Sequence, residues 1–457
     1  MPQTGQMCYN LMQKTKEKGG VFMKKALNGK KFYLALVIFS LVGQIAWVVE
    51  NMYLNVFIYK MFRATPEQIS LMVAASAVAA TVTTLLIGAL SDKLGKRKVF
   101  VCAGYILWGL SIWGFALIRL DWVDRAFFRT FSSLGPAMSL CVTLTIALDC
   151  IMTFFGSSAN DAAFNAWLTD ATDETNRGKA EGINAMMPLV AILAVFGGFM
   201  GVNQDLPESW TLIFGVIGTA VLAMGVLGFF LIEDTGVKTG ENQKYFANIF
   251  YGFRPSVIRQ NWSLYAVLAV FALFNIAIQI FMPYLILYYT EGLGMQDYVL
   301  IFAPAIVISA AFTGLYGRVF DKKGFAAAIW PTLILLMLGF VILYFVRTTV
   351  PVFIGSLVML CGYLGTGAVL GAMIRERTPK NKAGMFQGLR IVAQVLIPGV
   401  VGPAIGAAVL KNADTIVNTD GTTSFIPNEN IFLAAFVAGV VMLLALLPLL
   451  RLLKKKQ

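Results

Sequence analysis

The sequence of 457 residues contains no histidine, and only 13% of its residues are charged. Without histidine, Ser–His catalysis, Cys–His catalysis and histidine proton relays are excluded. Soluble proteins carry about 25% charged residues, so the low charge excludes an ordinary soluble domain. The five cysteines form no C-x-x-C pair, which argues against a zinc site. With no nucleotide-binding loop or metal cluster either, we expect no enzyme activity, no cofactor and no metal.

Long apolar stretches make up most of the chain. Hydrophobic residues are 58% of the sequence, and the mean hydropathy is +0.74. A helix that crosses a bilayer needs about 20 mostly apolar residues. We therefore predict an all-α, polytopic membrane protein with twelve transmembrane helices, at residues 32–59, 69–90, 98–118, 137–167, 180–202, 210–232, 263–289, 298–317, 325–346, 351–374, 385–410 and 431–453.

A polar stretch between the sixth and seventh helices divides the chain into two halves. Its charged residues and its Arg254-Pro255 pair are typical of a linker. We predict a cytoplasmic basic tail at 1–31, an N-terminal six-helix domain at 32–232, a cytoplasmic linker at 233–262, a C-terminal six-helix domain at 263–453 and a cytoplasmic tail at 454–457.

Positive charge follows the predicted topology. The formal net charge is +12, and 29 of the 36 Lys and Arg residues lie in the tails and in loops on one side. Cytoplasmic loops collect such residues, so we place these loops and both termini in the cytoplasm, with the chain in the cytoplasmic (inner) membrane. We expect the lipid bilayer as a partner and no nucleic acid.

The loop between the second and third helices contains a motif of five spaced residues. It reads Gly88-x-x-x-Asp92-x-x-Gly95-x-Arg97-Lys98. Gly88 allows two helices to approach closely, and Gly95 permits a tight turn. Asp92 can interact with the positive end of a nearby helix, and the cations hold the loop in the cytoplasm.

This motif resembles the loop between helices two and three of the major facilitator superfamily. Part of it recurs in the second half of the chain, as Gly317-x-x-x-Asp321-x-x-Gly324. Such internal repeats are typical of transporters. The resemblance implies two pseudo-symmetric six-helix domains that move against each other, with these loops as parts of a gate.

The first helix carries a polar stripe. Gln44, Trp47, Asn51 and Asn55 follow each other at helical spacing, and Glu50 borders them. An aromatic ring beside amides and a carboxylate suits a sugar or polyol, so we predict substrate-binding residues here. A packed polar seam between helices is the alternative.

The fourth helix carries two carboxylates at membrane depth. Asp149 lies on a stripe with Thr153, Gly156 and Asn160, and Asp161 lies on the neighbouring stripe. Because an ionisable group inside a membrane helix is costly, we predict that Asp149, Glu50 and Asp161 couple a cation to transport. For Asp161, an ion pair in an inner gate is the alternative.

In the second half of the chain, the candidate substrate residues are amides. Asn275 and Gln279 lie one turn apart on the seventh helix, and we predict that both contact the substrate.

The loop after helix four resembles that of glycoside–pentoside–hexuronide:cation symporters. It reads Ala166-Trp-Leu-Thr-Asp-Ala-Thr172, with Arg177 beyond it. The melibiose-type members carry paired aspartates in helix two, whereas helix two has no carboxylate here. We therefore favour a proton over sodium as the coupling cation.

Together these features predict a secondary active transporter that imports a sugar or glycoside with a proton by alternating access. Two alternatives stay open. One is a proton-driven exporter of drugs or metabolites, and the other is a non-transporting assembly factor or sensor on the same fold.

Overall fold

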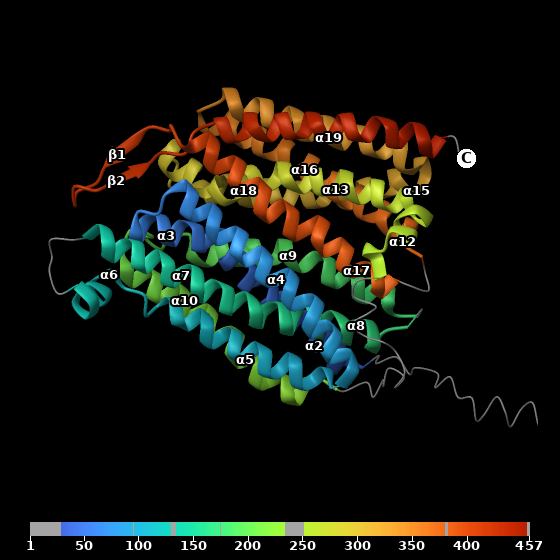
Figure 1. Cartoon of the computed structure of the whole chain (residues 1–457), viewed down its shortest axis with the longest axis horizontal. Coiled ribbons are helices and arrows are strands. Elements are labelled where there is room, and N and C mark those ends of the chain that lie inside the picture. Colours follow the sequence, from blue (N-terminus) through green and yellow to red (C-terminus); the bar gives the residue numbers. More distant parts are fainter. Residues whose placement is uncertain are drawn as a thin grey trace, which may run out of the picture.

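A computed structural model describes residues 29–94, 96–128, 134–173, 175–233, 251–379 and 383–454. In this part of the chain, twelve helices are long and apolar enough to cross a membrane. They lie side by side in one bundle, as Figure 1 shows. The predicted all-α class and the number of spans are confirmed. Most predicted bounds agree to within a few residues; the first span, for example, runs over Lys30–Phe62.

Spans one to six contain a series of helices, some of them broken by short π-helical turns. The label η marks short π-helical turns and, for η4 and η5, short 3-10 helices. The elements of this half are α2 (Lys30–Val48), η1 (Val49–Tyr53), α3 (Leu54–Phe62), α4 (Pro66–Leu94), α5 (Arg97–Phe115), α6 (Leu120–Val123), η2 (Asp124–Phe128), α7 (Leu134–Gly156), η3 (Ser157–Phe164), α8 (Asn165–Ala171), α9 (Arg177–Phe199) and α10 (Pro207–Leu231).

Spans seven to twelve follow the same plan, with the addition of a small sheet. Its elements are η4 (Tyr251–Phe253), α12 (Pro255–Gln260), α13 (Trp262–Phe281), η5 (Met282–Tyr284), α14 (Leu285–Leu287), η6 (Tyr288–Gly292), α15 (Tyr298–Phe345), α16 (Thr349–Arg377), α17 (Ala383–Ile391), η8 (Val392–Leu396), α18 (Ile397–Leu410), β1 (Thr415–Val417), β2 (Thr423–Phe425) and α19 (Asn430–Lys454).

Two spans merge into the single long helix α15. They meet at Gly324, whose φ of 74° and ψ of 178° are not helical. A side chain rarely adopts this φ, whereas glycine does so freely. The second copy of the loop motif therefore turns the chain at its final glycine. Much of the predicted linker, residues 234–250, lies outside the described residues.

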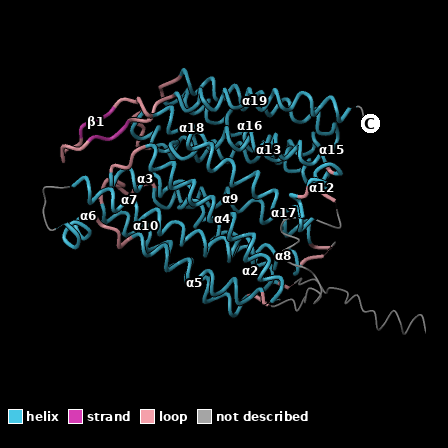
Figure 2. The backbone as a smooth tube through the Cα atoms, in the orientation of Figure 1, coloured by secondary structure: helices cyan, strands magenta, loops and turns pink. Residues whose placement is uncertain are grey.

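The two ends of the bundle differ. The antiparallel strands β1 and β2 pair Thr415 with Phe425 and project from one end, which we call the hairpin end (Figure 2). α2 begins and α19 ends at the opposite end, which we call the linker end (Figure 1). The sequence analysis treated residues 411–430 as a plain loop and did not predict this hairpin.

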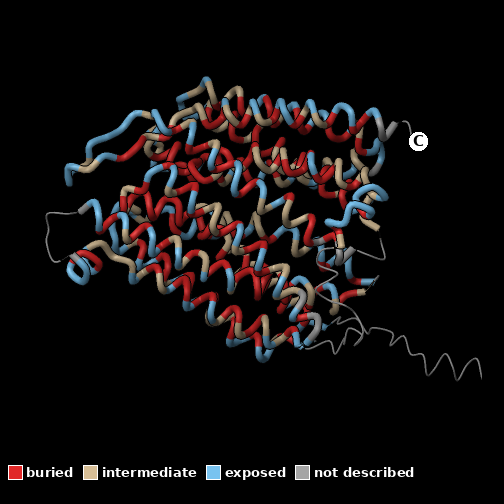
Figure 3. Tube along the Cα trace, viewed as in Figure 1, coloured by how far each residue is buried: buried red, intermediate tan, exposed pale blue. Residues whose placement is uncertain are grey.

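Glycines allow helices to pack closely where spans face each other. Buried residues gather on these inner faces, and many outer positions are exposed (Figure 3). A Cβ built on Gly362 of α16 would collide with the backbone of Leu336 in α15. Close approach through small residues is the usual way in which membrane helices gain packing energy. The contact between α15 and α16 therefore depends on Gly362.

This contact predicts a stability difference between two glycines of α16. Gly362→Ala should lower the midpoint of thermal unfolding in detergent by several degrees, since overpacking costs about 1–3 kcal/mol. Gly371→Ala is the matched control, because nothing lies within 4 Å of a Cβ at Gly371. Alanine favours helix, so the control should match or exceed the wild type. Equal midpoints for the two variants would contradict the packing account.

Candidate functional site

A cavity of about 300 Å³ lies between the first and second halves of the chain. Volumes of this order are typical of small-molecule sites. Its walls come from α2, η1, α9, α13, η5, α14, α15 and α16. The lining consists of Gln44, Trp47, Val48, Asn51, Met52, Pro188, Leu189, Ile192, Asn275, Ile278, Gln279, Phe281, Met282, Leu285, Phe302, Ile306, Met359, Leu360, Tyr363 and Leu364.

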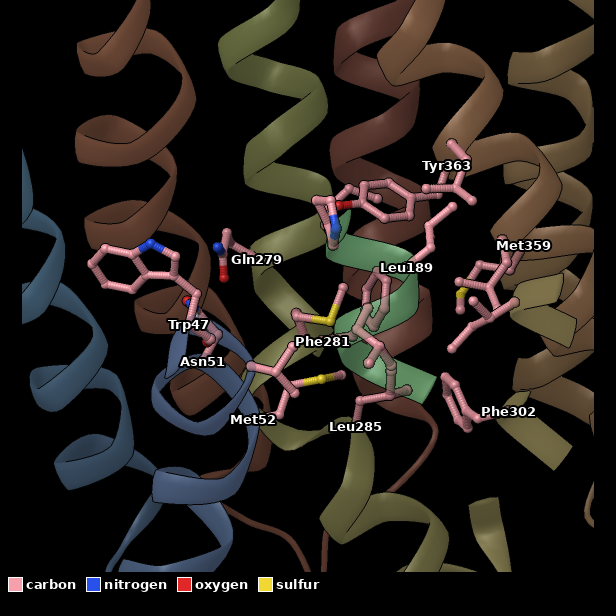
Figure 4. A pocket seen from close by; sticks show the side chains of 18 of the residues that line it. Trp47, Asn51, Met52, Leu189, Gln279, Phe281, Leu285, Phe302, Met359 and Tyr363 are labelled. Atoms are coloured by element: carbon pink, nitrogen blue, oxygen red, sulfur yellow. Dashed lines mark hydrogen bonds between the residues drawn. The ribbon is translucent and has the colours of Figure 1, made fainter. Parts of the chain in front are cut away.

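One wall of the cavity carries most of its hydrogen-bonding groups. Gln44, Trp47 and Asn51 come from the first span, and Asn275 and Gln279 come from the seventh. Figure 4 shows Trp47, Asn51 and Gln279 together on one side. Five of the seven predicted substrate residues therefore line one cavity. The amide nitrogens of Asn51 and Asn275 donate to backbone oxygens of their own helices, at 2.8 and 2.7 Å.

The opposite wall is mostly apolar, with the Tyr363 side chain of α16 as its hydroxyl-bearing residue. Leu189 of α9, Phe302 of α15 and Met359 of α16 lie on the far side of the cavity from Trp47 (Figure 4). Nothing in the sequence analysis selected these residues, because apolar side chains in a membrane helix look alike whether they face lipid, another helix or a cavity. Only the packing of the spans distinguishes them.

Glu50 points away from the cavity into a buried cluster. Its side chain is only 8% exposed, and its Oε1 accepts hydrogen bonds from Ser76 Oγ at 2.6 Å and Thr153 Oγ1 at 2.9 Å. The two hydroxyl oxygens are 2.7 Å apart. Spans one, two and four therefore meet at this carboxylate. The sequence analysis placed Glu50 with the substrate residues, and the structure places it behind them.

Successive residues of a helix point about 100° apart, so Glu50 and Asn51 face different directions, and the π-helical turn η1 changes the direction of the residues beyond it. A π-turn holds one residue more than an α-turn, so it rotates the following residues by roughly 100°. Within η1, Glu50 faces the cluster, whereas Asn51 and Met52 line the cavity. The predicted substrate residue Asn55 lies beyond the turn. It is fully buried, donates to the backbone oxygen of Asn51 at 2.9 Å and does not line the cavity.

Asp149 belongs to the same cluster as Glu50. It lies one helical turn before Thr153 in α7, is 2% exposed, and interacts with Ser76 and with the charge of Glu50. Its Oδ1, like Oε2 of Glu50, has no hydrogen-bond partner among the described residues. The structure thus brings together two of the three predicted coupling residues.

Asp161 lies farther along the fourth span, in η3. Ser157 Oγ donates to its Oδ2 and Asn160 Nδ2 donates to its Oδ1, both at 3.2 Å. No ion pair to Asp161 occurs among the residues that the structure describes. Its partners are neutral, so the gate ion pair considered from the sequence is not seen there.

The loop motif is only partly described. Gly95 lies outside the described residues, as do the side chains of Asp92 and Asp321. Arg97 is buried at the start of α5, with Nε 3.3 Å from Asp170 and Nη1 2.7 Å from Ser91. The motif therefore joins the helix two–three loop to the symporter-like loop after helix four.

The remaining motif residues lie near this junction or in the second copy of the motif. Lys98 follows Arg97 in α5, Gly88 lies in α4, where a Cβ would be 3.9 Å from Ala162, and Gly317 in α15 has nothing within 4 Å of a Cβ.

Contacts at the hairpin end join the two halves of the bundle. Lys60 of the first span, whose side chain is 7% exposed, lies 2.6 Å from Asp205 and 3.1 Å from Glu291 of the seventh span. Tyr59 donates its hydroxyl to the backbone oxygen of Phe425 in β2 at 2.6 Å. Tyr284 of the second half donates to the backbone oxygen of Pro66 at 2.9 Å. The cavity is therefore closed at the hairpin end.

The hairpin adds an ion pair to this closure. Asp420 lies 3.5 Å from Arg63, which ends α3 in a left-handed conformation. Hydrogen bonds from Thr422, and then the charge of Arg63, hold the pKa of Asp420 below its usual range. Asp420 therefore stays ionised at neutral pH, and the pair weakens only when the pH falls through that lowered pKa.

A bundle of twelve spans with a cavity between its two halves defines a helical membrane carrier. The family model of the Major Facilitator Superfamily matches residues 32–403, and the chain belongs to this family. No curated protein sequence matches the chain.

Solved structures share the fold at low sequence identity. A D-xylose–proton symporter is 14% identical, with a TM-score of 0.67, over 91% of this chain and 97% of that chain. A mutant of the nucleoside transporter NupG is 13% identical, with a TM-score of 0.66, over 92% and 99%. A bacterial homologue of the human lysosomal transporter Spinster, in an inward-facing conformation, is 13% identical, with a TM-score of 0.65, over 92% and 96%.

The closure at the hairpin end predicts the effect of neutralising Glu291. Glu291→Gln removes the ion pair of Lys60 with Glu291 and leaves the pairs of Lys60 with Asp205 and of Arg63 with Asp420. A partly screened pair contributes about 1 kcal/mol, so the open population should rise about fivefold. The measurement is the maleimide labelling rate of a cysteine placed at Met282, which lines the cavity.

Glu208→Gln is the matched control, because Glu208 pairs with Arg119 within the first half. This control should label at the wild-type rate. An unchanged rate in Glu291→Gln would show that the ion pair does not hold the hairpin end closed.

Proposed function

We propose that the protein is a secondary transporter that imports a sugar or glycoside together with a proton by alternating access. The observation that carries the proposal is the position of η1. This turn places Asn51 in the cavity and the adjacent Glu50 in the buried carboxylate cluster. Substrate contact and proton binding would thus act on neighbouring residues of one helical turn.

The polar wall of the cavity supports a hydroxyl-rich substrate. Side-chain amides both donate and accept hydrogen bonds, as sugar hydroxyls do, and the Trp47 indole offers an apolar face. Trp47 packs on Trp108 with ring centroids 5.1 Å apart, which holds the indole in place. A D-xylose–proton symporter among the fold neighbours is consistent with this proposal.

A count of hydrogens supports a proton in the carboxylate cluster. Glu50 Oε1, Ser76 Oγ and Thr153 Oγ1 make three mutual contacts of 2.6 to 2.9 Å. The two hydroxyls supply two hydrogens, so a third hydrogen is needed for every contact to be a hydrogen bond. A proton on Glu50 supplies it and also lowers the charge buried at membrane depth.

Release of that proton would change the packing of η1. An ionised Glu50 accepts hydrogen bonds but donates none, so the contacts with spans two and four must rearrange. Because Asn51 and Met52 belong to the same turn, the cavity wall would shift with them. A proton that moves inward across 100 mV releases about 2.3 kcal/mol, which suffices to drive accumulation.

The remaining predictions complete this proposal. We place the chain in the cytoplasmic membrane with both termini inside, so that the hairpin end faces outward. Residues 32–232 and 263–453 would be the two moving domains. The two copies of the loop motif would form the inner gate, and Asp161 would act as a further relay for the coupling proton.

A second candidate function is proton-driven export of apolar compounds. The largely apolar wall formed by Leu189, Phe302 and Met359 favours this candidate. The two functions predict different phenotypes. Cells that lack an exporter would become sensitive to toxic amphiphiles, whereas cells that lack an importer would lose uptake of one sugar.

The coupling proposal predicts that Asp149→Asn separates exchange from accumulation. Labelled sugars are offered to proteoliposomes with an imposed proton gradient, with a sodium gradient, or in counterflow. The variant should lose nearly all proton-driven accumulation and keep counterflow, which needs no net proton movement. Glu50→Gln should behave in the same way, because Glu50 does not line the cavity.

Asp173→Asn is the control for this experiment, since Asp173 lies in the loop after α8 and outside the cluster. It should accumulate substrate as the wild type does. Undiminished proton-driven accumulation by Asp149→Asn would remove Asp149 from the mechanism. Accumulation that only a sodium gradient drives would show that sodium, and not a proton, is the coupling ion.

A further inference from the structure

The polarity of the cavity is divided between its two walls. The four amides come from the first and seventh spans, and Leu189, Phe302 and Met359 come from α9, α15 and α16 (Figure 4). Two methionines, Met52 of η1 and Met282 of η5, also line the cavity. Thioether side chains adapt their shape to apolar groups of varied outline. One end of the cavity can therefore satisfy several hydroxyls, whereas at the other end only the Tyr363 hydroxyl offers a hydrogen bond beside the apolar Leu189, Phe302 and Met359.

Among the described residues that line the cavity, none is Asp, Glu, Lys or Arg. Glu50 is the nearest acid along the chain, and Ser76 and Thr153 occupy one of its oxygens on the far side of η1. A charged ligand would lose its hydration without gaining an opposite charge, which is strongly unfavourable. The lining therefore selects an uncharged ligand.

A free sugar fits only half of this cavity. Hydroxyls surround a pyranose ring, so those that face the apolar wall would be buried without a partner. The edge of a nucleobase would meet the same difficulty, since its ring nitrogens and carbonyl oxygens also need partners. An apolar ring or chain loses nothing there and gains from leaving water.

We propose that the substrate is an uncharged glycoside with an apolar aglycone, bound with its sugar against the amide wall and its aglycone against Leu189, Phe302 and Met359. This inference rests on the proposed function and narrows its substrate class. The sugar head supplies hydrogen bonds to the first and seventh spans. The aglycone contacts the fifth, eighth and tenth, so one ligand bridges both halves of the bundle.

The test measures binding to the purified protein by calorimetry. The ligands are D-glucose, D-galactose and D-xylose, each as the free sugar and as the methyl, phenyl and 4-carboxyphenyl β-glycoside. For any head group that binds, the phenyl glycoside should bind about tenfold more tightly than the methyl glycoside. The 4-carboxyphenyl glycoside should bind at least about tenfold more weakly than the phenyl glycoside, because its charge meets the apolar wall.

Leu189→Asn tests whether the apolar wall binds the aglycone. The change keeps the side-chain size and adds an amide, so the preference for phenyl over methyl should fall severalfold while methyl glycoside binding holds. Leu193→Asn, one turn along α9 and outside the lining, should keep the wild-type preference.

The outcomes separate the two proposals. If a sugar and its phenyl glycoside bind equally to the wild type, the aglycone inference is wrong and sugar transport stands. If the preference survives in Leu189→Asn, the assigned wall is wrong. If no sugar or glycoside of any head group binds, the proposed function fails, and this inference fails with it.

Discussion

The carboxylate of Glu50 accepts hydrogen bonds from Ser76 and Thr153 in the interior of a bundle of membrane helices. In hydrocarbon no water can replace such partners, and a buried polar group that loses its partner costs about 1–3 kcal/mol. Three spans are therefore held in register at this one carboxylate. The position of η1, and with it one wall of the cavity, depends on that interaction.

The first span connects the cavity, the carboxylate cluster and the closed end of the bundle. From the linker end toward the hairpin end it carries Trp47 in the cavity, Glu50 in the cluster, and Lys60 in the ion pairs with Asp205 and Glu291. A change at any of these points must be accommodated along a single helix, through a π-turn in its middle. In the proposed transport cycle, this single helix would connect proton binding, substrate binding and the contacts that close the hairpin end.

The sequence predicted the twelve spans because long apolar stretches in a membrane permit little besides helices. It also predicted five lining residues, since Gln44, Trp47 and Asn51 keep helical spacing up to η1, and Asn275 and Gln279 keep it on the seventh span. Glu50 and Asn55, which were grouped with them, do not line the cavity. The inserted residue of a π-turn leaves no mark in composition or spacing, and it rotates every side chain that follows.

The apolar wall and the hairpin were not predicted, for two further reasons. Leu189, Phe302 and Met359 acquire their role only when three helices distant in sequence pack around one space. β1 and β2 are three residues each, and their contacts with Tyr59 and Arg63 join segments more than 350 residues apart. The apolar wall has no local pattern and follows from tertiary packing alone. The hairpin does carry a local signal, because Asp420-Gly421 lies between two short stretches rich in β-branched residues, and Asp-Gly favours a hairpin turn.

Infrared difference spectroscopy of the purified protein tests the central claim most directly, because it observes the carboxyl groups themselves. The central claim is that the Glu50–Asp149 cluster changes its protonation when the cavity is filled. Addition of a transported glycoside at constant pH should change a protonated-carboxyl band, and Glu50→Gln or Asp149→Asn should remove or shift that change. A carboxyl band that is the same with and without substrate, or a change that both variants retain, would contradict the account.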